Sequence, residues 1–415
     1  MSASRSAKNI IQFTLLGIFS SISGSCNKEM SLPESNSGIH FYQLTGEEDL
    51  RAGASLSSGG SIMVGDQNTD ALLVAFDPSN KMLWQSTVAE SGKEAFNAVA
   101  EMPNGDIVAC GYTNSASFQT NNQSADILVT RLNSAGAILW SKVLGTEYDD
   151  FPFAMMVDSK GDILITGYTL DNHHRTLIFK VDGNGDEVWR QIYQVGAYRN
   201  MGKGIIELDN GHYLIAGENS QSAKPQEVNK MQTFLLEIFP NGNLVRSKTF
   251  PSYVKYQILY FAHYAIDIIK TDQGYILASF FYDESDAPCA QLLSLSLDYT
   301  ELNEKRFYGL GAFKPVTFKK LSDGFTLIGS STKTRTMEFP YFTESSAMLI
   351  KLDKDLNEVW QNTLGGGTIK QGSITVSENG TYWNVQGLST SLSSLLTQIM
   401  TYRINSENGE LIYEK

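Results

Sequence analysis

The chain has 415 residues, of which 42% are hydrophobic and 19% charged, so a large core is possible and disorder is not expected. Its formal net charge of -13 argues against binding nucleic acid or an anionic bilayer through a basic face. The only cysteines are Cys26, Cys110 and Cys289, which excludes a disulfide framework.

Residues 1–25 have the pattern of a lipoprotein signal peptide. Arg5 and Lys8 precede a short apolar run, and the small residues "SGS" stand directly before Cys26. The apolar run is too short and too rich in serine to span a bilayer. The junction resembles the lipobox of bacterial lipoproteins, and this resemblance implies that Cys26 carries lipid, palmitate included, and is the only membrane attachment. The alternative is an ordinary cleaved signal followed by a chance cysteine.

Residues 26–38 follow as the expected lipidated cysteine and a flexible tether. The sequence "NKEMSLPESNSG" is polar and without periodicity. Its "NKE" resembles the Lys-acid export signal that takes some lipoproteins of Gram-negative bacteria to the cell surface. That resemblance implies display on the surface, and retention on the periplasmic side of the outer membrane is the alternative.

Residues 39–415 contain seven copies of one unit. Each copy has a glycine-marked turn followed by an alternating apolar burst, and a second burst comes later in the copy. The turns are marked by Gly60, Gly105, Gly161, Gly211, Gly274, Gly324 and Gly380.

Each unit contains four runs of strand length, here named a, b, c and d. In the second copy they cover 96–102, 106–111, 126–133 and 137–144, and the a–b and c–d links, "PNG" and "NSAG", are tight turns. Glycines near the end of strand b, at positions 65, 111, 167 and 217, would let backbones approach closely. The pattern predicts an all-β protein, a seven-bladed β-propeller of four-stranded antiparallel blades.

These units resemble the seven-bladed propeller repeats of exported bacterial proteins and, more loosely, the tryptophan-docked repeats of quinoprotein-like propellers. Four copies place a tryptophan seven residues after an Asp or Asn, where a large ring could cover the seam to the next blade: Trp84, Trp140, Trp189 and Trp360. Arg246, Lys305 and Ile412 fall near that place in the other copies. The quinone-dependent relatives have eight blades and often an adjacent cysteine pair, so no cofactor is expected here.

The b–c links are long and unlike one another, which makes their face of the disc the expected binding face. Neutral drift of these loops is the alternative. The candidate ligand-binding residues in the b–c and d–a links are Phe118, Tyr148, Asp149, Asp150, His173, His174, Tyr341 and Phe342.

No catalytic residue and no metal site is predicted. His173 and His174 have only Asp171 nearby, so we expect a solvated loop pair rather than metal ligands. The acidic residues around positions 47–49 and 149–150 could bind calcium or act as acid and base, but solvated acids are the simpler expectation in so acidic a chain.

The sequence therefore favours a lipid-anchored, non-catalytic binding module for a protein or glycan partner at the outer membrane. Two alternatives remain open: a glycan hydrolase or lyase with its site at the centre of the long-loop face, and a scaffold subunit of an envelope complex.

Ring closure is the last expectation. The segment 39–44 is one strand too many for the first unit, so it should pair with the seventh blade, beside or in place of residues 410–414.

Overall fold

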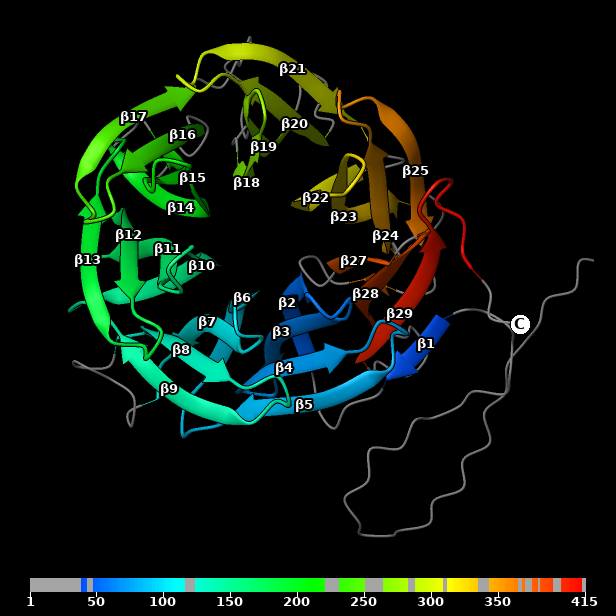
Figure 1. Ribbon diagram of the computed structural model, residues 1–415, viewed down its shortest axis with the longest axis horizontal. Helices are drawn as coiled ribbons and strands as arrows, with labels where there is room; N and C mark the ends of the chain where they lie inside the picture. Colours follow the sequence, from blue (N-terminus) through cyan, green and yellow to red (C-terminus); the bar gives the residue numbers. More distant parts are fainter. Residues whose placement is uncertain are drawn as a thin grey trace, which may run out of the picture.

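The computed structural model describes residues 39–42, 48–115, 124–220, 231–250, 264–282, 288–308, 312–334, 343–364, 368–369, 375–379, 381–390 and 397–412. These residues form strands and turns (Figure 1). None of the described segments forms a helix long and apolar enough to cross a membrane.

The strands form seven antiparallel sheets arranged in a ring, as the repeat predicts (Figure 1). In blades 1 to 6 the four strands follow chain order, the first next to the central axis and the fourth on the rim. Blades 1 to 3 contain β2 (Glu48–Ser55), β3 (Ser61–Gln67), β4 (Asp70–Phe76), β5 (Met82–Val88), β6 (Glu94–Glu101), β7 (Ile107–Thr113), β8 (Asp126–Leu132), β9 (Ile138–Leu144), β10 (Asp149–Val157), β11 (Ile163–Leu170), β12 (His174–Val181) and β13 (Glu187–Tyr193).

Blades 4 to 6 contain β14 (Tyr198–Glu207), β15 (Tyr213–Ser220), β16 (Met231–Ile238), β17 (Leu244–Phe250), β18 (Tyr264–Thr271), β19 (Gly274–Tyr282), β20 (Pro288–Leu295), β21 (Glu301–Phe307), β22 (Ala312–Lys320), β23 (Phe325–Thr334), β24 (Thr343–Leu352) and β25 (Glu358–Leu364). Blade 7 contains β26 (Thr368–Ile369), β27 (Thr375–Asn379), β28 (Tyr382–Thr390), β29 (Thr397–Asn405) and β1 (Ile39–Tyr42).

The seventh blade joins the two ends of the chain. β1 pairs antiparallel with β29, from Ile39 opposite Tyr402 to Tyr42 opposite Ile399. Beyond Ile39, Leu411 near the C-terminal end forms a bridge with Ile404. The outer edge of this blade is therefore made of two segments placed end to end, and the predicted pairing of the N-terminal strand with blade 7 is confirmed.

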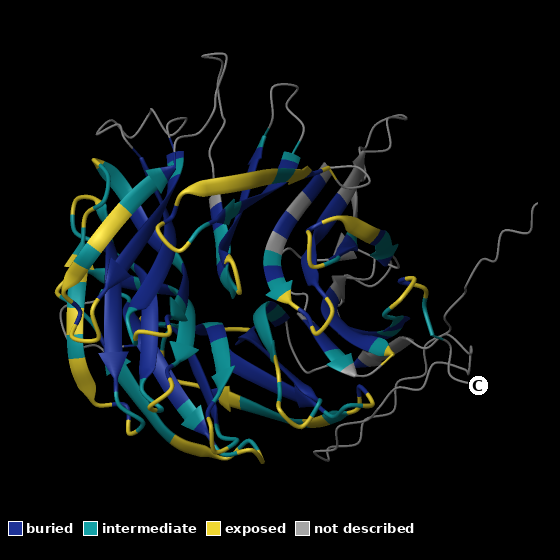
Figure 2. Ribbon diagram, turned by 45° about the horizontal axis from the view of Figure 1, so that its top comes forward, coloured by how far each residue is buried: buried dark blue, intermediate teal, exposed yellow. Residues whose placement is uncertain are grey.

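The hydrophobic core lies between the blades. Seven buried clusters each combine residues of two neighbouring blades. At the closing seam, Leu50 and Phe76 of blade 1 pack with Leu388, Ile399 and Tyr42 of blade 7. The inner strands are more buried than the rim strands, because neighbouring blades cover them on both sides (Figure 2).

A β-bulge in the innermost strand recurs opposite the predicted glycines of strand b. In blade 2 the register shifts between Phe96 and Ala98, and Gly111 pairs with Phe96. A Cβ on Gly111 would lie 1.7 Å from the carbonyl oxygen of Ala95, so only glycine fits. The bulged residues of blades 1 to 4 are Arg51, Asn97, Phe153 and Lys203.

The bulged residues touch their neighbours around the axis. Arg51 donates to Asn97 Oδ1 at 3.0 Å, and Asn97 donates to the carbonyl of Pro152 at 3.0 Å. The ammonium group of Lys203 lies 3.2 Å from the ring centroid of Phe153. The bulges thus bring polar and aromatic side chains of successive blades together.

The tryptophans cover the seams between blades, as predicted. The indole N–H of Trp84 donates to the carbonyl of Ser134 in the next blade, and that of Trp360 donates to Ser406. Arg246 of blade 4 makes the corresponding contact with the carbonyl of Leu297. Trp140 is only half-buried, so its ring contributes less to the seam than a fully buried one.

Candidate functional site

The acidic residues of the d–a links hold those links in place. Asp150 is fully buried and accepts a hydrogen bond from Thr146 Oγ1 at 3.1 Å, and burial raises the pKa of its carboxyl. Glu94 occupies the equivalent position at the start of blade 2 and accepts a hydrogen bond from Thr113 Oγ1 at 2.8 Å. Asp149 accepts from the backbone N–H of Ala125 at 2.8 Å. The burial of Asp150 argues against direct contact with a ligand, and it is not the solvated acid that we expected.

An aromatic cluster lies at the long-loop end of blades 2 and 3. It consists of Tyr112, Phe151, Phe153, Tyr168 and His174, which come from β7, β10, β11 and β12. Phe151 lies between Tyr112 and Tyr168, with ring centroids 5.4 Å away on each side. Tyr168 continues the row to Phe153 at 5.6 Å and to His174 at 4.7 Å. All five side chains are half-buried, so each keeps part of its surface open to solvent.

The strands explain why these rings meet. Tyr112 and Tyr168 follow the glycines of strand b, Gly111 and Gly167, by one residue. Phe151 is paired with Tyr168 across β10 and β11, and Phe153 is the bulged residue of β10. The bulge turns an extra side chain toward the neighbouring blade, so aromatic side chains of two blades come together near the axis.

Cationic side chains border the aromatic cluster. The guanidinium of Arg51 lies 5.5 Å from the ring centroid of Tyr112 and donates to Asp66 Oδ1 at 2.7 Å. Lys203 covers Phe153, and its ammonium group is 3.9 Å from the buried carboxylate of Glu218. Cations placed on aromatic faces are stabilised by the negative face of the ring.

The electrostatic environment keeps His174 uncharged at neutral pH. Burial, followed by the charges of Arg199, Lys203 and His173, lowers the pKa of His174 to about 4. Burial also lowers the pKa of Lys203, and it raises the pKa of Glu218. The phenol of Tyr168 has a raised pKa because it is partly desolvated. This site therefore holds an uncharged imidazole beside a protonated phenol.

The structure separates the residues that the sequence proposed for ligand binding. His174 belongs to the aromatic cluster, and His173 is exposed at its margin with its ring 5.0 Å from that of Tyr198. Tyr148 lies apart, in an open groove of about 460 Å³ that is also lined by Arg175 and Arg190. Phe118, Tyr341, Phe342 and Cys26 lie outside the described residues.

Sequence reasoning missed Arg51, Phe153 and Lys203. A signal for them exists, because each lies 14 residues before the glycine of strand b in its own blade, at positions 65, 167 and 217. Aligning the repeats on those glycines would have placed the three residues at one equivalent position around the axis. Arg199 has no such signal, since the backbone irregularity that carries it occurs in blade 4.

A larger groove, of about 530 Å³, lies on the opposite face between blades 5 and 6. Its aromatic residues, Tyr275 and Phe325, are buried in the core, and its charged residues, such as Lys354 and Asp355, are exposed on a turn. Nothing in this groove combines open aromatic surface with charge, so we place the candidate site at the aromatic cluster. Among the described residues, no three His, Cys, Asp or Glu side chains come together as metal ligands would.

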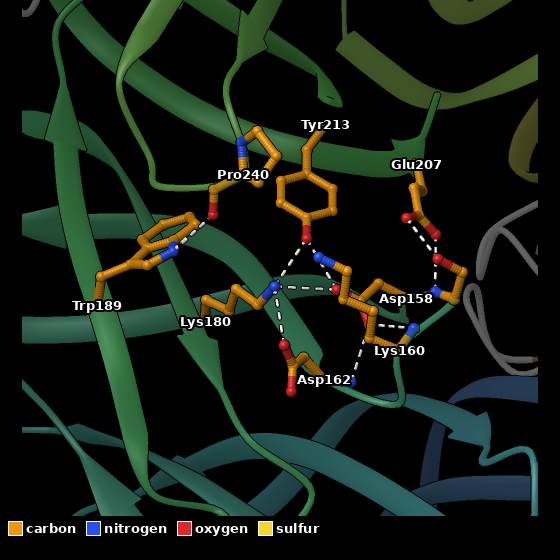
Figure 3. Close-up of polar contacts among 9 residues, drawn as sticks. Asp158, Lys160, Asp162, Lys180, Trp189, Glu207, Tyr213 and Pro240 are labelled. Atoms are coloured by element: carbon orange, nitrogen blue, oxygen red, sulfur yellow. Dashed lines mark hydrogen bonds and ion pairs between the residues drawn. The ribbon is translucent and has the colours of Figure 1, made fainter. Parts of the chain in front are cut away.

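A polar network on the turn face of blades 3 and 4 is structural (Figure 3). Lys180 Nζ donates to Asp158 Oδ2 at 3.0 Å and to the hydroxyl of Tyr213 at 2.8 Å, and it lies 2.9 Å from Asp162. Burial opposes the charge of Lys180, but these contacts outweigh it and raise the pKa of the ammonium group. Because every polar group in the network has a partner in the neighbouring turn or blade, it serves to join the two blades.

Comparisons with known proteins support the fold. No protein-family model matches this chain, and neither does any curated protein sequence. Among solved structures, it is similar to a protein of unknown function from Dyadobacter fermentans DSM 18053, with a TM-score of 0.52 and 13% identity over 76% of this chain and 95% of that one. It is also similar to the polysaccharide lyase Uly1, with a TM-score of 0.51 and 10% identity over 87% of this chain and 90% of that one.

A weaker likeness, with a TM-score of 0.47 and 9% identity, is to the periplasmic gluconolactonase PpgL of Pseudomonas aeruginosa, over 88% of this chain and 97% of that one. Identities this low show the fold alone. The chain is thus a seven-bladed β-propeller, and its function has to be argued from its own residues.

Proposed function

We propose that this propeller is a binding module for a glycan, which it holds at the aromatic cluster on the long-loop face. The observation that carries the proposal is the row of half-buried rings Tyr112, Phe151, Tyr168 and His174 beside the axis. Sugar rings present C–H faces that stack on aromatic rings, and their hydroxyls need polar partners nearby. Both kinds of group lie within the cluster and its border.

We also propose that lipid on Cys26 holds the protein at the outer membrane, on its periplasmic side or at the cell surface. β1 runs toward the long-loop face, because Tyr42 pairs with Ile399 near the start of β29. The chain therefore enters β1 from the direction of the opposite face. A tether of residues 27–38 would reach roughly 20 Å on average. The anchored module would then present its aromatic cluster away from the membrane.

The test of glycan binding is a pair of tyrosine variants. Tyr168→Ala removes the central ring of the cluster, whereas Tyr148→Ala removes an aromatic ring elsewhere on the same face. We expect binding on a glycan array, and then in calorimetric titration, to weaken at least about tenfold for Tyr168→Ala, because the aromatic surface on which the sugar ring stacks is lost. Tyr148→Ala should bind as the native chain does. Equal binding by both variants would contradict the proposal.

A glycan lyase is the second candidate, and the pairing of an uncharged His174 with a protonated Tyr168 favours it. In such an elimination, a base removes the proton beside the carboxylate of a uronate. The bond from the adjacent carbon to the glycosidic oxygen then breaks, and the leaving oxygen takes up a proton, which yields an unsaturated sugar. His174 is unprotonated and can accept the proton, and Tyr168 is protonated and can donate one. The likeness to a polysaccharide lyase is compatible with this reaction but shows only the fold.

Ultraviolet absorbance of the unsaturated product tests the second candidate. Uronate polysaccharides incubated with the protein should give a steady increase in absorbance that is lost in His174→Ala and Tyr168→Phe. Binding without any increase in absorbance would leave the binding module as the function and reject the lyase.

A further inference from the structure

Arg199 has an unusual backbone at the entrance to blade 4. Its φ is 51°, in the left-handed region that side chains other than glycine and asparagine rarely adopt. Four other non-glycine residues in the described segments share this sign: Asn68, Asn80, Tyr299 and Leu356. Each of those four residues lies in a hairpin turn that requires a positive φ, as Asn80 does between β4 and β5.

No hairpin requires this conformation at Arg199. The residue lies inside β14, where the pairing with β15 skips from Tyr198 to Met201. Arg199 and Asn200 stand opposite the single position 219 of β15, so β14 has a second β-bulge here that the innermost strands of blades 1 to 3 do not have. Backbone strain of this kind is retained at positions that hold a side chain for function.

The strained backbone places the arginine beside the aromatic cluster. The ring of the adjacent Tyr198 lies 6.4 Å from that of His174, and the charge of Arg199 acts on His174, Lys203, Glu218 and Tyr168. The adjacent Asn200 donates to the backbone carbonyl of His174 at 3.3 Å, which ties the two blades together at this point. The Nε of Arg199 and the Nδ1 of His174 are both buried without a hydrogen-bond partner among the described residues.

Positive charge is in excess at this point. Arg199 and Lys203 are both half-buried, and the carboxylate that faces them is Glu218, 3.9 Å from Lys203. Two cations that repel one another in partly desolvated surroundings are costly unless an anion joins them.

We propose that Arg199 and Lys203 form an anion subsite beside the aromatic cluster, so that the ligand is a glycan carrying carboxylate or sulfate groups. This inference rests on the proposed glycan binding and specifies its substrate class. The sugar ring would stack on Tyr168 while its acidic group meets the two cations, with His174 as a hydrogen-bond partner. An acidic peptide shares the charge but lacks the rigid ring that the row of aromatic side chains suits.

The decisive variant is Arg199→Gly. Glycine adopts a φ of 51° without steric strain, so this change removes the charge and relieves the backbone at the same time. We expect the variant to melt at the same temperature as the native chain or higher. Loss of binding in this variant therefore cannot be ascribed to misfolding. Arg175→Gln, which removes a cation from the Tyr148 groove, is the matched control.

Calorimetric titration of the full chain with three tetrasaccharides and one peptide gives the readout. The probes are a galacturonate oligomer, a sulfated galactan, an unsulfated galactan and an oligoglutamate. We expect the carboxylated or the sulfated sugar to bind at least about tenfold more tightly than the neutral one, and the difference to shrink with added salt. Comparison of the two acidic sugars identifies which anion is preferred. In Arg199→Gly the difference should vanish, while binding of the neutral sugar persists and Arg175→Gln behaves as the native chain does.

Three outcomes overturn the inference. Equal binding of neutral and acidic sugars would reject the anion subsite and leave the proposed glycan binding intact. Preference for oligoglutamate over every sugar would replace the glycan by an acidic protein partner. Failure of all three sugars to bind, with Tyr168→Ala also without effect on the glycan array, would reject both the subsite and the proposed function.

Discussion

Removal of the N-terminal strand is expected to open the ring. Deletion of residues 27–45 takes away β1, whereas deletion of residues 27–37 takes away only the segment before it. The first deletion should destabilise the protein strongly, because blade 7 loses most of its outer strand and the edge of β29 is uncovered. The second should change the free energy of unfolding by less than about 0.5 kcal/mol.

The contacts of Tyr42 set a lower limit on the stability that the deletion of residues 27–45 removes. Its side chain is 7% exposed, packs against Phe76 with ring centroids 5.7 Å apart, and donates to the backbone carbonyl of Asn80 at 2.9 Å. Loss of a buried aromatic side chain costs about 3–5 kcal/mol, and its hydrogen bond accounts for about 0.5–1.5 kcal/mol of such a loss. The deletion of residues 27–45 should therefore cost at least about 3–5 kcal/mol, and Tyr42→Phe only about 1 kcal/mol.

Urea unfolding followed by tryptophan fluorescence and by circular dichroism measures these differences. Agreement between the two probes shows whether the ring unfolds as one unit. Size-exclusion chromatography adds a second readout, because an uncovered β29 edge should promote association. If both deletions unfold at the same urea concentration, the ring is closed by blade packing alone and our reasoning about β1 is wrong.

Three further predictions follow from burial and geometry. Trp360→Ala should cost about 3–5 kcal/mol in urea unfolding and the half-buried Trp140→Ala distinctly less; equal costs would mean that burial does not set the strength of the seams. Gly111→Ala should lower the melting temperature sharply or prevent folding, because its Cβ would lie 1.7 Å from the Ala95 carbonyl oxygen; a variant as stable as the native chain would contradict that geometry. His174 takes up a proton only near pH 4 when folded but near its ordinary pKa of 6.5 when unfolded, so stability should fall by about 1–2 kcal/mol as the pH drops from 7 to 4; a His174→Gln variant with the same pH profile would refute this.

The repeat made the architecture readable from the sequence. Strand alternation and tight turns are local features, so the seven four-stranded units could be counted before any contact was known. The spare segment before the first unit pointed to β1, since a strand without a partner in its own unit has to pair elsewhere. In blade 3 the b–c link was expected over residues 168–175, but it is only residues 171–173, because β11 runs to Leu170 and β12 begins at His174. The ends of these strands were missed because they contain polar residues, which interrupt the alternation of apolar residues from which strands are predicted.

The candidate site depended on contacts between blades. His174 was taken as part of a solvated pair, yet it packs on Tyr168, because the pairing of β11 with β12 extends to Leu170 opposite His174. Lys203 and Phe153 are 50 positions apart in the sequence and touch only because two bulges meet at the axis. Sequence spacing carries no information on such contacts unless the repeats are aligned on the bulge itself.

By itself, the sequence determined the strands, the turns, the number of blades and the tryptophans of the seams, because each of these is specified within one unit or between neighbouring units. The tertiary structure alone decided which side chains share the axial end of the long-loop face. That face is assembled from one short segment of each blade, and the segments become neighbours only when the blades pack side by side. The row of rings is a consequence of that packing, since it joins Tyr112 of blade 2 to Phe151 of blade 3.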